Sequence, residues 1–336
     1  MAMTIKDIAR LSGYGVGTVS RVLNGSTNVS DAAREKIEAV VREHNFDLNT
    51  NAKHLRQQAP SGIAVIVKGT QNMLFAALMV QLQGLIREKG YACLVYYIDE
   101  EDNEVQQALR ICRERHPQGV LFLGSSLNAF RQDFTKIGIP CVLVTNSARD
   151  LGFENLSSVS TDDAAGAQMA VEHLIELGHR NIGILSGKTE TSNAAFTRFA
   201  GCGRAFETHG LPFDRVKQVA SARFTLESGY EAMTELLQKN EELTAVFAMS
   251  DVMALGAIRA IHDRGLRVPE DISVIGYDGI PMAGFMTPKL TTVCQDREKI
   301  ARRCVEILLG SIEEKKKAIH EVTPFVLLQG ESVRKI

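Results

Sequence analysis

The sequence predicts a chain of two unlike parts: an all-α unit at the N-terminus, then an α/β unit made of two parallel-sheet lobes. Residues 1–46 show only helical periodicity, with apolar side chains three and four positions apart. From residue 62 onward, short apolar strands alternate with amphipathic stretches of helical length, which is typical of parallel sheets covered on both faces. Because about 275 residues exceed what one such core holds, two lobes are expected.

Three short helices are expected in residues 1–46. A capping box at residues 4–7 starts the first helix, and Gly13 ends it. The apolar face of this helix is formed by Ile5, Ile8, Ala9 and Leu11. A second helix runs over residues 15–23, and Ser30 caps a third, whose apolar side chains recur up to Phe46. Helices joined by a glycine turn are typical of a helix-turn-helix unit.

Residues 47–61 are polar, and a helix this short is marginal in water without further contacts. The segment is therefore either a plain linker or a helix that folds when a partner supplies contacts. The remaining boundaries follow from the alternation of strands and helices. We expect the first lobe over about 62–160 and 292–320, and the second over about 161–291 and 321–336.

Apolar runs and amphipathic periods locate the elements of the α/β unit. Strands are expected at 63–67, 92–97, 120–123, 141–144, 182–185, 245–248, 272–276 and 325–328. Helices are expected at 74–88, 164–177 and 252–264.

Composition excludes several classes of protein. No apolar run is long enough to cross a bilayer, and the charged N-terminus lacks the core of a signal peptide, so a cytoplasmic protein is expected. The net charge of −2 argues against nucleic-acid binding when taken alone. Residues 1–60, however, hold eight basic and six acidic side chains, so the total charge says little about what this part contacts.

Sites for metals, cofactors and catalysis are not indicated. The six cysteines include no C-x-x-C pair, and Cys112 with His116 is too small a set of metal ligands. The glycines at residues 13–17 follow a predicted helix, whereas a dinucleotide-binding loop must follow a strand. Because no phosphate-loop or nucleophile motif occurs, we expect neither an enzyme nor a bound cofactor.

Two blocks of the N-terminal unit, TIKDIA at 4–9 and TVSRVLNG at 18–25, resemble the lac repressor family of bacterial transcription regulators. The resemblance continues in order through LGHRNI at 177–182, DVMALG at 251–256 and VPEDISVIGYD at 268–278. It implies a periplasmic-binding-protein-like sensor domain and a homodimer that binds a palindromic DNA operator. The implied function is a ligand-responsive transcription regulator, and we expect it to be a repressor.

The resemblance also implies which residues contact DNA. In the helix-turn-helix unit these are Thr4, Gly15, Val16, Gly17, Thr18, Ser20, Arg21, Asn24 and Asn28. The second helix would lie in the major groove, with Val16, Gly17 and Arg21 nearest the base edges and the hydroxyl and amide side chains on phosphates. Tyr14-Gly15 replaces the valine-serine that is usual in the family, and Val16 and Gly17 offer no side-chain hydrogen bonds to bases.

In the family, residues 47–61 correspond to a hinge helix that enters the minor groove, where a leucine opens the central base step. The matching residues are Asn49, Ala52, Lys53 and Leu55. Leu48 stands where proline is common, which leaves the start of the hinge less rigid. An inert tether is the alternative interpretation.

A small-molecule pocket is expected between the lobes, at the carboxyl ends of the strands. The residues implied are Phe75, Thr145, Asn146, Arg198, Phe224, Ser250, Asp278 and Gln295. An arginine and an aspartate across a cleft with aromatic walls suit a sugar, although Asp278 could instead cap a turn and Arg198 could be solvated. Thr145 replaces an aspartate that is frequent in the family, so the ligand class stays open. A solute-binding protein and a Rossmann-type enzyme are the alternative functions; the first would need a signal peptide and the second a phosphate loop.

Overall fold

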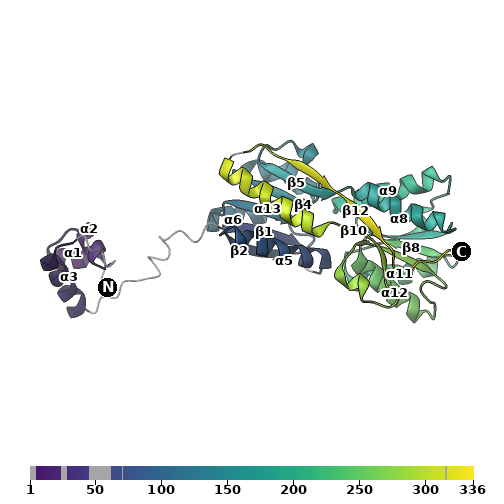
Figure 1. Cartoon of the computed structure of the whole chain (residues 1–336), viewed down its shortest axis with the longest axis horizontal. Coiled ribbons are helices and arrows are strands. Elements are labelled where there is room, and N and C mark those ends of the chain that lie inside the picture. Colours follow the sequence, from purple (N-terminus) through teal and green to yellow (C-terminus); the bar gives the residue numbers. More distant parts are fainter. Residues whose placement is uncertain (1–4, 24–28, 45–61, 70, 315) are drawn as a thin grey trace. The chain divides into compact units, whose positions relative to one another are not determined.

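The computed structural model describes residues 5–23, 29–44, 62–69, 71–314 and 316–336 (Figure 1). Contacts within the chain divide it into two compact units, Met1–Ala59 and Pro60–Ile336. The predicted hinge at 47–61 lies outside the described residues. No helix in the described part of the chain is long and apolar enough to span a bilayer.

Among its described residues, the N-terminal unit has three helices, α1 (Ile5–Ser12), α2 (Val16–Leu23) and α3 (Asp31–Glu43). Its small core consists of Ile8, Ala9, Val19, Val22 and Ile37. The predicted place of Leu11 in the core is wrong, since 46% of this residue is exposed, whereas Ser12 is fully buried. At 3.6 residues per turn, Ser12 falls between Ile8 and Ala9 on the helix surface, and Leu11 falls outside them.

The first lobe contains a six-stranded parallel sheet with the strand order β11-β5-β4-β3-β1-β2. Its strands are β1 (Gly62–Lys68), β2 (Ala92–Ile98), β3 (Gly119–Leu123), β4 (Cys141–Thr145), β5 (Leu156–Thr161) and β11 (His320–Thr323). Its helices are α5 (Met73–Glu88), α6 (Glu104–Arg115), α7 (Leu127–Asp133) and α13 (Arg297–Glu314), with short 3₁₀ turns η1 (Phe134–Lys136) and η2 (Arg149–Leu151). Residues 63–67 are fully buried, and alternate side chains of this strand belong to two different hydrophobic clusters, so the sheet is covered on both faces.

The second lobe also has a six-stranded sheet, with the order β12-β10-β9-β8-β6-β7, in which β12 is antiparallel to β10. Its strands are β6 (Ile182–Gly187), β7 (Val219–Ala222), β8 (Ala245–Ala248), β9 (Ser273–Asp278), β10 (Thr291–Gln295) and β12 (Phe325–Leu328). Its helices are α8 (Asp163–Glu176), α9 (Asn193–Thr208), α10 (Arg215–Gln218), α11 (Leu226–Lys239) and α12 (Asp251–Asp263), with the 3₁₀ turn η3 (Pro281–Gly284).

The eight predicted strands are confirmed, each with ends within two residues of those observed. The strands β5, β7, β10 and β11 were not predicted from the sequence. Two of them, β5 with the sequence LSSVST and β10 with TTVCQ, are rich in serine and threonine although they are largely buried. Hydrophobic periodicity therefore gives no signal for these strands.

The chain passes between the lobes three times, after β5, after β10 and after β11. The expected lobe boundaries need correction here, because residues 292–295 pair with the second sheet and residues 321–323 with the first. Hydrogen bonds to neighbouring strands decide sheet membership, and no local pattern in the sequence reports them. In Figure 1, the last helix, α13, lies beside β4 and β5 of the first lobe.

Helices α8 and α9 approach closely at one glycine, and we expect that position to tolerate no side chain. A Cβ on Gly201 would lie 2.1 Å from the backbone oxygen of Ala164, whereas a Cβ on Gly203, in the same helix, meets nothing within 4 Å. Gly201→Ala should lower the free energy of unfolding by about 1–3 kcal/mol through overpacking. Gly203→Ala should raise it by about 0.5–1 kcal/mol through the backbone entropy of glycine. Urea unfolding of both variants checks this, and equal effects would contradict the packing argument.

Candidate functional site

The second helix of the N-terminal unit presents a solvent-facing surface at the positions predicted to read DNA. Gly15, Val16, Gly17 and Arg21 are exposed, and 46% of Val16 is accessible. Thr18 and Ser20 are half-buried at the edge of this surface. Val19 and Val22, on the other side of α2, lie in the core. The helix thus has one packed face and one free face, as docking in a DNA groove requires.

Tyr14 and Gly15, which depart from the family pattern, fit the turn before α2. The Tyr14 ring packs against the core of the unit, and the Lys36 ammonium lies 5.9 Å from the ring centroid. The carbonyl of Gly15 accepts hydrogen bonds from the amides of Thr18 (2.9 Å) and Val19 (3.1 Å), so the helix begins without a capping hydroxyl. Among the other predicted DNA contacts, Thr4, Asn24, Asn28, Asn49, Ala52, Lys53 and Leu55 lie outside the described residues.

A cleft between the two lobes of the α/β unit encloses about 920 Å³, the open solvent at its mouth included. Its walls come mainly from segments that follow strands of both sheets, which is where open parallel sheets form binding sites. Of the eight predicted ligand-binding residues, the lining includes Phe75, Thr145, Asn146, Arg198, Phe224 and Asp278.

The other two predicted residues, Ser250 and Gln295, lie behind the lining. Ser250 accepts a hydrogen bond from the Met253 amide (3.3 Å) and caps α12. The Gln295 side-chain amide donates to Asp278 (2.9 Å) and accepts from the Thr161 hydroxyl (2.9 Å). Gln295 therefore orients Asp278 and connects it to the ends of β5 and β10, where the chain passes between the lobes.

Arg198 lines the cleft but is only 5% exposed. Its Nε donates to Asp163 (2.8 Å), and one Nη donates to Asp278 (3.5 Å). The other Nη donates to the carbonyl of Met249, and the guanidinium lies 3.7 Å from the centroid of the Tyr277 ring. These contacts exclude a solvated Arg198 and give Asp278 more than the role of a turn cap.

Burial and charge act against each other in this cluster. Burial alone would lower the pKa of Arg198, but the carboxylates of Asp163 and Asp278 outweigh it and hold the pKa above its ordinary value. Burial raises the pKa of Asp278 to about 6, and the positive charge of Arg198 opposes that rise. The two carboxylates thus stabilise the charged form of the guanidinium.

Two residues of the cleft have backbone conformations that are rare outside glycine. Thr145, at the end of β4, has φ of 75°, and Asp278, at the end of β9, has φ of 118°. Such conformations cost on the order of 1–3 kcal/mol each and concentrate at functional sites. Since threonine is β-branched, its position is the more costly of the two. Both turn the chain into the cleft at the end of a strand.

Aromatic rings form two walls of the cleft, and each lies against a glycine. A Cβ on Gly124 would lie 2.6 Å from the Phe75 ring, and a Cβ on Gly187 would lie 2.6 Å from the Phe224 ring. Gly124 follows β3 in the first lobe, and Gly187 ends β6 in the second. The glycines thus let each phenyl ring pack directly against the backbone at a strand end.

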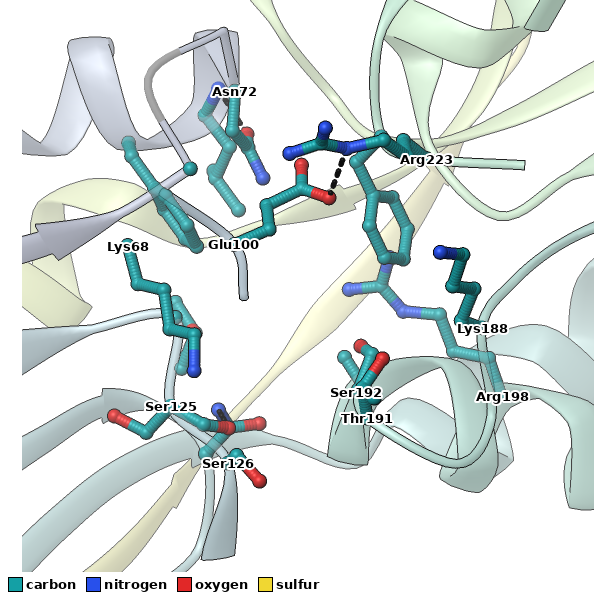
Figure 2. A pocket seen from close by; sticks show the side chains of 18 of the residues that line it. Lys68, Asn72, Glu100, Ser125, Ser126, Lys188, Thr191, Ser192, Arg198 and Arg223 are labelled. Atoms are coloured by element: carbon teal, nitrogen blue, oxygen red, sulfur yellow. Dashed lines mark hydrogen bonds and ion pairs between the residues drawn. The ribbon is translucent and has the colours of Figure 1, made fainter. Parts of the chain in front are cut away.

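Lys68 reaches into the cleft from the first lobe, on the side opposite Arg198 (Figure 2). Its ammonium lies 2.8 Å from a carboxylate oxygen of Glu104, which is fully buried. The other oxygen of Glu104 accepts from the Ser126 amide (2.6 Å) and so positions the loop after β3. The lysine charge is thereby neutralised within the wall.

Ion pairs join the two lobes along one side of the cleft. Arg223 of the second lobe contacts Asp99 (3.1 Å) and Glu100 (3.0 Å) of the first, and Figure 2 shows Arg223 facing Glu100. Lys188 and Glu101 form a second pair at 3.5 Å. Because these side chains are partly exposed, each pair contributes about 0–1 kcal/mol.

Two buried polar atoms in the cleft have no partner among the described residues. They are the Oγ of Ser125 and the Oδ1 of Asn146, both in residues that are at least nine-tenths buried. The Asn146 amide nitrogen is occupied by the carbonyl of Ser125 (3.1 Å). A buried polar atom without a partner costs about 1–3 kcal/mol, which a bound ligand with hydroxyl groups would offset.

Sequence reasoning missed several lining residues. These include Lys68, Asn72, Glu100, Glu101, Ser125, Ser126, Lys188, Thr191, Ser192 and Arg223. Most of them come at or directly after the end of a strand that the sequence did predict. The rule that ligands bind at the carboxyl ends of parallel strands would have found them.

Comparison with known proteins is consistent with this division of the chain. Residues 4–49 match the model of the bacterial regulatory proteins of the lacI family, and residues 171–333 match that of a periplasmic binding protein-like domain. The chain is 34% identical over 333 residues to the HTH-type transcriptional regulator MalR of Clostridium butyricum, covering 98% of this chain and 99% of the relative. It is 32% identical over 311 residues to the ribose operon repressor of Haemophilus influenzae, covering 92% of each chain.

Two solved structures have a similar fold over nearly the whole chain. A complex of the transcriptional regulator CelR with cellobiose has a TM-score of 0.71 and 29% identity, and the match covers 98% of this chain and 99% of that one. The lac repressor dimer bound to operator and the anti-inducer ONPF has a TM-score of 0.71 and 25% identity, covering 99% of this chain and 100% of the other.

The fully buried carboxyl of Asp251, at the start of α12, leads us to predict a dependence of stability on pH. Burial raises the pKa of this carboxyl to about 8, and the Asp278 charge adds to the rise. From about pH 4 to pH 8, the folded protein keeps a proton that the unfolded chain releases, so the free energy of unfolding falls as pH rises. Asp251→Asn removes this titration and should make the fall shallower by up to about 1.4 kcal/mol per pH unit. Urea unfolding from pH 5 to pH 7 measures both slopes, and identical slopes would contradict the assignment.

Proposed function

Because the chain belongs to the lacI family of bacterial regulatory proteins, we propose that its DNA binding responds to an uncharged, polyhydroxylated molecule held in the cleft, and that it acts as a repressor. The ligand is a sugar or a sugar derivative. The observation that carries this proposal is the polar lining of the cleft, in which the cations are already paired with carboxylates, whereas the neutral atoms Ser125 Oγ and Asn146 Oδ1 have no partner among the described residues.

Charge pairing argues for a neutral ligand. Each of the four cations that line the cleft, among the described residues, lies within ion-pair distance of a carboxylate. Lys68 and Arg198 are paired inside the wall, where removing a partner from a buried charge costs several kcal/mol. A phosphate would compete with those carboxylates, whereas a hydroxyl group leaves the pairs in place.

The free polar atoms argue for hydroxyl groups in particular. Asn146 Oδ1 can accept a hydrogen bond, and Ser125 Oγ can both donate and accept. Sugar hydroxyls do both, so one ring can satisfy both atoms. The phenyl rings of Phe75 and Phe224 supply the apolar walls against which the carbon faces of a sugar pack.

The N-terminal unit supplies the DNA-binding half of the proposal. The exposed face of α2, with Val16, Gly17 and Arg21, enters the major groove, where Arg21 bonds to guanine. The active species is a homodimer on a palindromic operator, which the solved dimer of a similar chain on its operator supports. The hinge role of residues 47–61, with Leu55 in the minor groove, stays a prediction.

A binding protein rather than an enzyme is the function that the relatives favour, since they are named as regulators and repressors. A solute-binding protein would share the two lobes but gives no reason for the first 49 residues, which match a DNA-binding family. We place the regulator in the cytoplasm, because its operator is chromosomal DNA.

The ligand response should depend on Arg198. Arg198→Ala removes the contacts to Asp163 and Asp278 and should abolish the effect of any effector on operator binding, while operator affinity without effector stays within about threefold. Fluorescence anisotropy with a selected palindromic DNA measures both quantities. A retained response would reject the pocket assignment.

Arg198→Ala leaves two buried carboxylates without their partner, so a lost response in this variant can also result from misfolding. A second variant, which is expected to fold normally, separates the two explanations. Ser125→Ala removes an oxygen that has no partner in the described protein and should leave the melting temperature unchanged or higher. Its affinity for the effector should fall about five-fold, the value of one hydrogen bond of about 1 kcal/mol. Unchanged effector affinity would remove Ser125 from the site.

Sequence readout should depend on Arg21. Arg21→Ala removes a bidentate contact worth about 1–3 kcal/mol, so specific operator affinity should fall roughly 5- to 150-fold. Arg42→Ala, an exposed arginine on α3, is the control and should change affinity less. Both variants are titrated with operator and with scrambled DNA at one salt concentration. Equal losses on the two DNAs would show that Arg21 contacts phosphate and not bases.

A further inference from the structure

A second groove adjoins the cleft at Ser126, Thr191 and Ser192. Figure 2 shows these three residues on the side of the cleft away from the Glu100–Arg223 pair. It encloses about 610 Å³, the open solvent above it included. Ser126 belongs to the first lobe, and Thr191 and Ser192 belong to the second; all three line both cavities. A ligand seated in the cleft can therefore extend into this groove without leaving the protein surface.

The groove contains an aromatic side chain that is largely exposed to solvent. Phe196, in the first turn of α9, lines the groove and is 63% exposed. Exposing a phenyl ring forgoes about 1.5–3 kcal/mol of burial. Asn128 and Arg131 of the first lobe and Glu190 and Asn193 of the second lie in the same lining, so that amide and charged groups accompany the ring.

We infer that this groove is a second subsite, in which a further sugar ring of the effector stacks on Phe196. The inference rests on the proposed function and extends it from a sugar to a disaccharide or longer glycoside. The C–H groups on one face of a pyranose carry partial positive charge and pack on the negative face of an aromatic ring. The hydroxyls at the ring edge find the amide of Asn193 and the side-chain nitrogen of Asn128, whose Oδ1 already accepts a hydrogen bond from Arg131 (3.0 Å). On the other side of the cleft, Arg223 pairs with Asp99 and Glu100 of the opposite lobe, so an elongated ligand extends toward Phe196.

The test compares disaccharides with their own component sugars on the full-length protein. Cellobiose, maltose and lactose are titrated beside glucose and galactose by calorimetry and by thermal shift. We expect at least one disaccharide to bind ten-fold tighter than its components. If no disaccharide binds tighter than its monosaccharides, the second subsite is wrong.

Variants at Phe196 then test whether the tighter binding of the disaccharide depends on this ring. Phe196→Ala should weaken the disaccharide about ten-fold and leave the monosaccharide within two-fold, whereas Phe196→Tyr should keep the wild-type affinities. Phe285→Ala is the matched control, because Phe285 is 87% exposed and lines neither cavity. A disaccharide affinity unchanged by Phe196→Ala overturns the subsite.

Failure of the subsite and failure of the proposed function give different results. If sugars bind and Arg198→Ala abolishes their binding, but Phe196→Ala has no effect, the function stands and the subsite is rejected. If no sugar in the panel raises the melting temperature of the wild-type protein, both the sugar assignment and the subsite are rejected.

Discussion

The guanidinium of Arg198 holds the floor of the cleft together. It connects α9, which carries it, to Asp163 at the start of α8, to the carbonyl of Met249 after β8, and to Asp278 at the end of β9. Buried charges persist only when they are paired and hydrogen-bonded, so these four segments must keep their spacing for the charge to stay there. Gly201, one turn after Arg198 on α9, sets the same spacing by allowing α9 to touch the backbone of α8.

The same cluster connects the ligand site to the passages between the lobes. Asp278 accepts from Gln295, and Gln295 accepts from Thr161, which in turn lies 3.4 Å from Thr323. Thr161, Gln295 and Thr323 are the last residues of β5, β10 and β11, after which the chain changes lobe. A ligand that is hydrogen-bonded to Asp278 would therefore contact a chain of hydrogen bonds that runs to the segments where the two lobes are connected. Under the proposed function, these contacts would couple ligand binding to the geometry of the lobes, which is what a DNA-binding response to an effector needs.

Much of the fold follows from local patterns in the sequence. The helices of the N-terminal unit and eight strands of the α/β unit carry periodic or continuous apolar residues, and each of them is observed. Strands β5 and β10 were not predicted, because their buried serine and threonine side chains form hydrogen bonds to groups from distant segments, as the Thr161–Gln295 contact illustrates. The resemblance to a known family placed six of eight predicted residues in the cleft lining. It gave no role to Lys68 or Arg223, since each pairs with a carboxylate that is far away in the chain. It gave none to Ser125 either, whose side-chain oxygen is buried without a partner only in the folded protein.

The sequence by itself determined the elements, their order, the family and the class of function, because helix and strand periods and motif spacings are local properties. The tertiary structure alone decided which charges are neutralised and which polar atoms are free. Lys188 meets Glu101 and Arg223 meets Glu100 across the two lobes, over 87 and 123 residues. Whether a cation is available to a ligand depends on such long-range pairs. A local stretch of sequence does not indicate which distant side chains lie close together in the folded protein. The neutral character of the cleft, and the exposed ring of Phe196 beside it, are therefore properties of the folded protein.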